Sequence, residues 1–204
     1  MLDDAGYEDV QIMASNSLDE YTIRTILHQG AKLDSFGVGE RLITSKSSPV
    51  FGGVYKLVAT EDENGKITPK IKISENVTKI TTPGFKELYR FYENETGKAM
   101  GDVIALRDEE IPKDNYEVFH PIYTWKRKTL TDYTVKKVLV QIYDKGELVY
   151  KMPSLDEIRQ RAKDELDTLW EETKRLDNPN EYIVDLSEEL WKLKDNLLKK
   201  HGKN

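Results

Sequence analysis

The stretch at residues 29–42, which reads QGAKLDSFGVGERL, constrains the fold of this chain more than any other segment. Residues 32–36 predict a strand, and this strand runs directly into Gly37-Val38-Gly39. Upstream, the apolar run at residues 10–14 predicts a buried strand with Ser15-Asn16 at its carboxyl end. Ligands prefer that edge of a parallel sheet, so the two strand ends form the first candidate site.

A helix is expected between these two strands. Ser17 and Glu20 match a capping box, in which each side chain accepts a hydrogen bond from the backbone N–H of the other residue. Apolar side chains within residues 23–27 have the spacing of one helical face, and Gly30 supplies the stop. Beyond the second strand, Arg41-Leu42-Ile43 predicts a short helix or turn.

Gly37-Val38-Gly39 has the chemistry of a phosphate-binding loop, because residues without a Cβ let backbone N–H groups approach an anion closely. A helix start after the loop adds a favourable dipole. A tight strand-to-helix turn is the alternative interpretation, since G-x-G alone is a weak signal. The context favours phosphate, because the loops after the last two strands of parallel α/β barrels recurrently bind it.

Length and composition limit the possible architectures. A complete (β/α)₈ barrel needs about 250 residues, so a chain of 204 residues is expected to hold only part of one. The 31 basic and 37 acidic residues give a net charge of -6, which argues against a nucleic-acid or anionic-membrane binder. The absence of cysteine excludes disulfides, thiol nucleophiles and cysteine-zinc sites. No signal peptide or long apolar run is visible, so we expect a cytoplasmic protein.

The first residues predict a chain that begins partway through a fold. Residues 1–7 resemble the last turn of a helix closed by Gly6 in a left-handed conformation. We therefore expect a C-terminal fragment of a longer protein, with a frayed leader as the alternative.

Strand-like runs alternate with turn signals between residues 54 and 150. Lys56 shares the period-2 face of Val54 and Val58, so its ammonium is a candidate phosphate ligand, although an edge or snorkelling lysine is the commoner role. The expected strands are residues 54–58, 71–73, 77–81, 88–92, 103–106, 138–143 and 147–150. We expect 88–92 to pair with 103–106 across a loop, and Asp144-Lys145-Gly146 to form the turn of a hairpin between the last two strands.

Two helices are expected at the C-terminal end. Ser154 and Glu157 repeat the capping-box pattern, and the first helix should bury an apolar stripe and end at Asn178-Pro179. A second helix opens at Leu186-Ser187. The stripes, with two tryptophans assigned to the core, are Ile158, Ala162, Leu166, Leu169 and Trp170 in the first helix and Leu190, Trp191, Leu193, Leu197 and Leu198 in the second.

Several blocks of the sequence resemble the nicotinate phosphoribosyltransferases, of the type II phosphoribosyltransferase family. They are ASNSLDEYTI, QGAKLDSFGVGERLIT and SPVFGGVYKLV. The likeness continues through Thr82-Pro83-Gly84, Phe119-His120-Pro121, PSLDEIRQRAKDELDTLWEE and NPNEYIVDLSEELW, so it covers essentially the whole chain.

The resemblance implies an α/β fold: a C-terminal portion of an irregular (β/α) barrel at residues 1–60, a β-rich region at 61–152 and C-terminal helices at 153–204. The intact enzyme would make nicotinate mononucleotide from nicotinate and phosphoribosyl pyrophosphate, with ATP hydrolysis and Mg²⁺, in NAD salvage. It would be a cytoplasmic homodimer with no nucleic-acid or membrane partner.

The resemblance also assigns the candidate substrate-binding residues. Ser15 and Asn16 follow one strand, and the loop Gly37, Val38, Gly39 with Glu40 follows the next. Arg41 and Lys56 are further candidates, which come from their place in the sequence and not from the resemblance. Many relatives have threonine where this chain has Glu40, so we expect Glu40 to offer its backbone N–H while its carboxylate turns away from the phosphate. Arg41 would offset that charge.

No catalytic or metal-binding residue is expected within the chain itself. The resemblance places the phosphoryl-accepting histidine upstream, and His28, His120 and His201 each have a structural reading. This chain alone is therefore expected to be inactive. A non-catalytic phosphate-ligand or dimerisation module is the alternative function, and the two differ in whether the encoding gene continues upstream.

Overall fold

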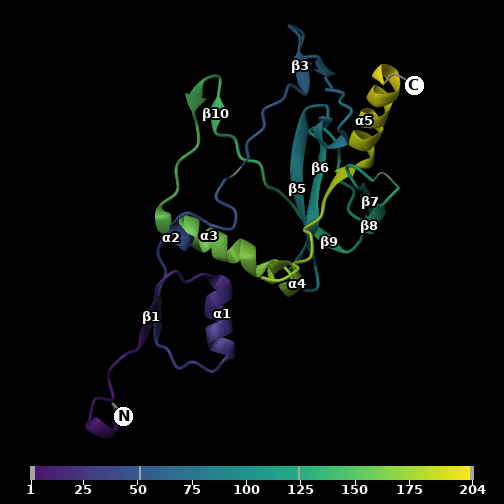
Figure 1. Cartoon of the computed structure of the whole chain (residues 1–204). Coiled ribbons are helices and arrows are strands. Elements are labelled where there is room, and N and C mark those ends of the chain that lie inside the picture. Colours follow the sequence, from purple (N-terminus) through teal and green to yellow (C-terminus); the bar gives the residue numbers. More distant parts are fainter. Residues whose placement is uncertain (1–2, 51, 124, 203–204) are drawn as a thin grey trace. The chain divides into compact units, whose positions relative to one another are not determined.

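The computed structural model describes residues 3–50, 52–123 and 125–202, and the chain divides into two compact units, residues 1–54 and 55–204 (Figure 1). Together they give a mixed α/β protein with a six-stranded sheet and a C-terminal helix. The three-part division expected from the sequence stays a prediction. No helix in the described part of the chain is long and apolar enough to cross a membrane.

The first unit confirms the expected strand-helix-strand order. The parallel strands β1 (Met13–Ser15) and β2 (Ser35–Gly37) flank α1 (Glu20–His28), and α2 (Glu40–Ile43) follows β2. Gly30, with φ of +82°, closes α1 as expected by donating its N–H to the carbonyl of Leu27 at 3.0 Å. A 3-10 turn, η1 (Asp3–Ala5), ends at Gly6 with φ of +81°, while Met1 and Leu2 lie outside the described residues.

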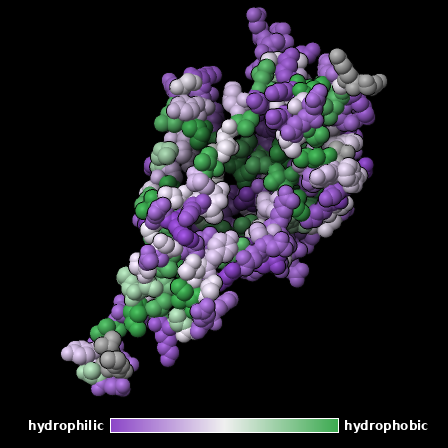
Figure 2. All heavy atoms as spheres, viewed as in Figure 1, coloured by the Kyte–Doolittle hydropathy of each residue, from purple (hydrophilic) through white to green (hydrophobic). Residues whose placement is uncertain are grey.

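Burial in the first unit is lower than the sequence predicts. Ile12 and Met13 are 49% and 67% exposed, so the prediction of a buried strand is wrong. The physical reason is that β1 and β2 form a two-stranded sheet, which leaves little apolar surface to cover a strand. Hydrophobic side chains of this unit consequently reach its surface (Figure 2).

Three of the predicted strands, at residues 54–58, 71–73 and 77–81, are absent from the structure, so these predictions are wrong. Residues 54–58 form no regular element, and Val54 and Tyr55 are 79% and 98% exposed. The hairpin instead joins β3 (Ala59–Glu61) to β4 (Ile67–Pro69), where Asp62 Oδ1 accepts hydrogen bonds from the turn amides. Residues 77–79 form the 3-10 turn η2 (Val77–Lys79), because Asn76 caps it through a bond from Thr78 N.

The main sheet has the strand order β8-β7-β12-β6-β5-β9. The predicted antiparallel pairing of residues 88–92 with 103–106 is confirmed within β5 and β6. Phe91 is the centre of the core, stacked on Tyr116 with ring centroids 5.6 Å apart and edge-on to Tyr133 at 4.8 Å. The strands are β5 (Lys86–Glu93), β6 (Ala99–Leu106), β7 (Tyr116–Phe119), β8 (Arg127–Leu130), β9 (Tyr133–Lys137) and β12 (Val184–Ser187).

The strand β12 lies between β6 and β7 and leads directly into α5 (Glu188–His201), which packs on β6, β7 and β12 (Figure 1). Ser187 is the buried N-cap of α5, as the predicted helix start requires. Its Oγ accepts from Leu190 N at 3.1 Å and donates to Glu109 Oε2 at 2.6 Å. Trp191 stacks on Phe119 with centroids 4.9 Å apart, which supports its predicted core role.

The first C-terminal helix is shorter and more exposed than predicted. The capping box of Ser154 and Glu157 is confirmed, but α3 (Leu155–Asp167) ends well before Asn178, and α4 (Glu171–Lys174) is separate. At the C-terminal end of α3, a residue of the β5–β6 turn binds a backbone carbonyl: Lys98 Nζ donates to Asp167 O at 2.7 Å. The expected burial of its stripe is wrong: Ile158, Leu166 and Trp170 are 46%, 54% and 42% exposed.

The predicted hairpin around Asp144-Lys145-Gly146 is confirmed with shorter strands. It joins β10 (Tyr143–Asp144) to β11 (Glu147–Leu148). Lys145 and Gly146 both have positive φ, at 48° and 88°, as a two-residue type I′ turn requires.

Replacing Ser187 with alanine should destabilise the second unit more than the same change at Ser154. Both serines cap a helix, but only Ser187 is buried and also donates to Glu109. We expect a loss of about 2 kcal/mol in the free energy of unfolding for Ser187→Ala against roughly 1 kcal/mol for Ser154→Ala. Urea titration measures both, and equal losses would contradict a contribution from the Glu109 bond.

Asp185, in β12, should make stability depend on pH. Burial raises the pKa of its carboxyl group, although His120 and Lys128 oppose the shift. As the pH rises above 3.8, the unfolded chain loses this proton first, so the free energy of unfolding falls until the folded-state pKa is passed. Asp185→Asn should therefore be more stable than the parent at pH 7.

The advantage of Asp185→Asn should shrink as the pH falls towards 4, because the raised pKa means that Asp185 takes up its proton in the folded chain before it does in the unfolded chain. Urea titrations at the two pH values, followed by tryptophan fluorescence, measure the difference. Asp144→Asn at an exposed position is the matched control and should show no such pH dependence. An advantage for Asp185→Asn that is equal at both pH values would exclude ionisation as its cause.

Candidate functional site

The ends of β1 and β2 bring together the two strand-end segments that the sequence singles out. Ser15 lies directly opposite Gly37 in the parallel register, and Ser15 Oγ donates to Gly37 O at 3.3 Å. Asn16 follows with φ of +91°, so the chain turns sharply as it leaves β1. The two predicted loops therefore start side by side at the carboxyl edge of the same small sheet.

This close approach favours glycine at position 37. A Cβ at position 37 would lie 3.0 Å from Ser15 Oγ and 3.3 Å from Ser15 Cβ, which is tighter than ordinary contact. A Cβ at Gly39, in contrast, would meet no heavy atom within 4 Å. The loop therefore packs against β1 at its first glycine and faces open space at its second.

Glu40 and Arg41, in the first turn of α2, have different surroundings. Glu40 is exposed, which is compatible with a carboxylate turned away from a bound anion, although its proposed backbone contact stays a prediction. Arg41 forms an ion pair with Asp19, and the two side chains are 31% and 19% exposed. Its guanidinium is thus paired with Asp19 rather than with Glu40.

Asp19 is a site residue that the sequence interpretation missed. The N-cap of α1 is Asp19 and not Ser17, because Ser17 has φ of +51° while Asp19 has the extended conformation that a cap needs. Asp19 Oδ1 accepts from Thr22 N at 2.8 Å. The bonds from Thr22, followed by the contribution of Arg41, lower the pKa of Asp19 to about 2. The sequence did contain a signal for this cap, because aspartate is as good an N-cap as serine.

Lys56 belongs to the second unit, where its side chain is exposed. The strand that was expected to orient it is absent from residues 54–58. Its role as a phosphate ligand stays a prediction.

The histidines have structural settings. His120 Nδ1 accepts hydrogen bonds from Ile122 N at 3.1 Å and Tyr123 N at 2.9 Å, so it shapes a turn. His28 and His201 lie in the last turns of α1 and α5. Among the described residues, no group of three or more acidic or histidine side chains is arranged to hold a metal ion.

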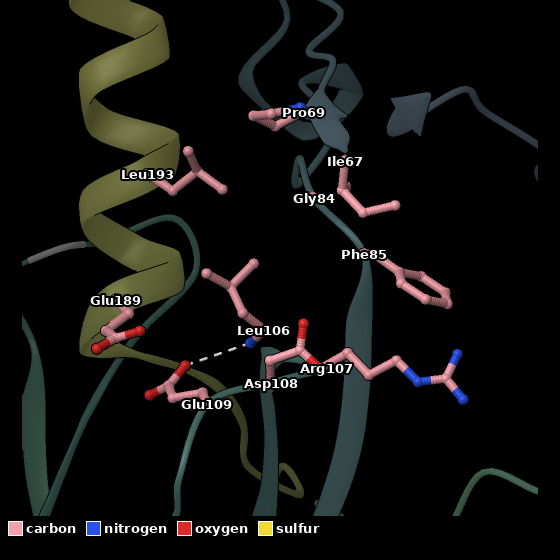
Figure 3. Close-up of a pocket in the computed structure, with 10 residues that line it drawn as sticks. All are labelled: Ile67, Pro69, Gly84, Phe85, Leu106, Arg107, Asp108, Glu109, Glu189 and Leu193. Atoms are coloured by element: carbon pink, nitrogen blue, oxygen red, sulfur yellow. Dashed lines mark hydrogen bonds between the residues drawn. The ribbon is translucent and has the colours of Figure 1, made fainter. Parts of the chain in front are cut away.

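A second candidate is a cavity of about 330 Å³ between α5 and the ends of β5 and β6 (Figure 3). Two of its polar side chains, Glu109 and Arg107, are already used by the fold. Glu109 accepts from Leu106 N at 3.2 Å, Tyr116 Oη at 3.0 Å and Ser187 Oγ at 2.6 Å, and the Arg107 guanidinium lies 4.5 Å from the centroid of the Phe85 ring. The strand-end loops of the first unit are therefore the stronger candidate.

Comparisons with known proteins concern the chain as a whole and not this site in particular. Residues 85–194 match the family model described as the nicotinate phosphoribosyltransferase C-terminal domain. The chain is 45% identical to the nicotinate phosphoribosyltransferase of Bacillus subtilis (strain 168) over 192 residues, covering 94% of this chain and 39% of that protein. It is 36% identical to the Caenorhabditis elegans protein of the same name over 188 residues, covering 91% and 32%.

A solved structure gives the same result. The crystal structure of human nicotinic acid phosphoribosyltransferase aligns with a TM-score of 0.68 and 26% identity, covering 96% of this chain and 35% of that one. The chain thus spans between about a third and two fifths of the length of these relatives.

Proposed function

Because the chain belongs to the nicotinate phosphoribosyltransferase family, we propose that it forms the part of such an enzyme that holds the phosphate end of phosphoribosyl pyrophosphate. The observation that carries the proposal is the close parallel pairing of Ser15 with Gly37, which sets two small-residue loops side by side at one strand edge. In α/β proteins this edge is where ligands bind.

The proposed contacts are mainly with the backbone. The N–H groups of Gly37, Val38, Gly39 and Glu40 would bind the 5′-phosphate, and Ser15 and Asn16 would bind it or the ribose from the neighbouring loop. Open space at Gly39 leaves room for an anion to approach. With the phosphate held at a fixed point, the ribose would be positioned for attack by the nicotinate nitrogen.

We also propose a fold, an oligomeric state and an activity for the natural protein that contains this chain. Its first unit would be part of an irregular (β/α) barrel, and the protein would be a cytoplasmic homodimer that makes nicotinate mononucleotide with ATP hydrolysis in NAD salvage. Mg²⁺ would arrive with the pyrophosphate of the substrate and offset its charge. The described residues of this chain provide no cluster to hold that ion by themselves.

Replacing Gly39 with valine should weaken phosphoribosyl pyrophosphate binding in the natural protein. No heavy atom lies within 4 Å of a Cβ at this position, so the branched side chain should obstruct the ligand rather than the fold. We expect a rise in Kd of about tenfold or more, equivalent to about 1.4 kcal/mol. Titration calorimetry measures the affinity, and circular dichroism checks that the variant is folded.

The matched control is Gly52→Val, a glycine in the same unit that also has no neighbour within 4 Å and lies outside the loop. It should leave the affinity as it is. If Gly39→Val binds phosphoribosyl pyrophosphate as tightly as the parent, this loop does not hold the phosphate.

The 204-residue chain by itself should make no nicotinate mononucleotide from nicotinate, phosphoribosyl pyrophosphate, ATP and Mg²⁺. The reason is that the phosphoryl-accepting histidine of the family is expected upstream of this chain, and His120 is engaged in a turn. Chromatographic detection of product measures the outcome, with the natural protein as the positive control. Product above a no-protein blank would show that this chain contains the chemistry after all.

If the natural protein binds phosphoribosyl pyrophosphate but makes no product, a non-catalytic phosphate-ligand module becomes the better description.

A further inference from the structure

The ion pair between Arg41 and Asp19 joins the segment that follows β1 to the segment that follows β2. Asp19 is the N-cap of α1, and Arg41 lies in α2, directly after the glycine loop. The pair therefore spans the two loops that are proposed to share one phosphate.

The carboxylate of Asp19 is oriented by two different partners. Oδ1 accepts from Thr22 N at 2.8 Å, and Oδ2 contacts Arg41 Nη1. The adjacent Leu18 is 5% exposed and anchors the same loop. Because these contacts fix Asp19 within the segment that follows β1, its carboxylate can hold the Arg41 guanidinium in place.

On the other side, α2 has little apolar anchorage of its own. Leu42 and Ile43 are 69% and 84% exposed, and Gly39 at the N-cap has no side chain that could cap the helix. The ion pair of Arg41 with Asp19 connects α2 to the segment that follows β1, which these residues do not. The position of the glycine loop then depends on that ion pair as well as on the β1–β2 ladder.

We propose that Arg41 is a positioning residue, whose ion pair with Asp19 holds the loop at residues 37–39 in place beside the loop that follows β1. In this role Arg41 acts through Asp19 and does not bind the phosphate itself. The inference rests on the proposed function for its effect on ligand binding, whereas the effect on the loop can be measured without a ligand.

Three variants of the natural protein separate positioning from direct contact: Arg41→Met, Asp19→Asn and the double variant. Asparagine caps helices as well as aspartate does, so Asp19→Asn removes the charge pair and keeps the cap. If the pair positions the loop, each single variant should weaken phosphoribosyl pyrophosphate binding on the order of tenfold. The double variant should be no weaker than either single one.

Direct contact predicts a different pattern. If Arg41 bound the phosphate, Asp19→Asn would release the guanidinium and remove a nearby negative charge, so affinity would stay the same or increase while Arg41→Met lost it. That opposite response of the two single variants would overturn the proposal.

Amide hydrogen exchange of residues 37–44 in the ligand-free protein is the second readout. Arg41→Met and Asp19→Asn should both accelerate exchange there, and unchanged exchange in both would also overturn the proposal. Arg24→Met is the matched control: it removes a guanidinium that lies 5.7 Å from the Tyr21 ring centroid on α1, and should leave the loop unchanged.

The two readouts also distinguish the failure of the two ideas. If the parent protein does not bind phosphoribosyl pyrophosphate, the proposed function fails, and the exchange rates still decide whether the ion pair positions the loop.

Discussion

The guanidinium of Arg90 connects more elements of the second unit than any single apolar contact could. It binds Asp102 through two parallel bonds of 2.8 and 3.0 Å and reaches Glu165 at 2.6 Å, so it joins β5 to β6 and to α3. Tyr182 Oη donates to the same Asp102 at 2.8 Å, which brings in the segment before β12. The bonds to Asp102 raise the pKa of Arg90 above its already high value, so the guanidinium stays charged. The sheet and the exposed α3 are thereby held together although α3 buries little apolar surface.

The first unit relies on a different kind of interaction. Leu18 is the one hydrophobic side chain among its described residues that is counted as buried, whereas the second unit has an aromatic core around Phe91. Order at the strand ends of the first unit comes from the backbone ladder, the Asp19 cap and the pair with Arg41. The candidate site is therefore built on polar geometry and close backbone approach, with little help from a hydrophobic core.

The features that the sequence predicted well are local ones. Gly30, Ser154 and the turn at Lys145-Gly146 each act through neighbours a few residues away, so pattern and conformation coincide. The two strand ends of the candidate site were each predicted from a local pattern, although their parallel pairing joins residues 22 positions apart. Asp19 was missed because two adjacent residues can both serve as caps, and only the backbone conformation decides between them.

The features that failed depend on distant partners. β12 pairs with β6 and β7, strands that lie about 65 to 85 residues earlier in the sequence. No local pattern specifies such a partner, so only its role as a helix start was anticipated. Residues 54–58 show the reverse case, since their alternating pattern suits a strand, yet they join no sheet in the described part of the chain.

The chemistry of the loop pair has a consequence for how its strength would vary with acidity. Peptide N–H groups do not titrate, arginine keeps its charge at any pH at which proteins are handled, and the pKa of Asp19 is about 2. The affinity of the loops at residues 15–19 and 37–41 for a phosphate of fixed charge would then be constant across the neutral pH range. Any change in affinity there would report the protonation of the phosphate rather than that of the protein.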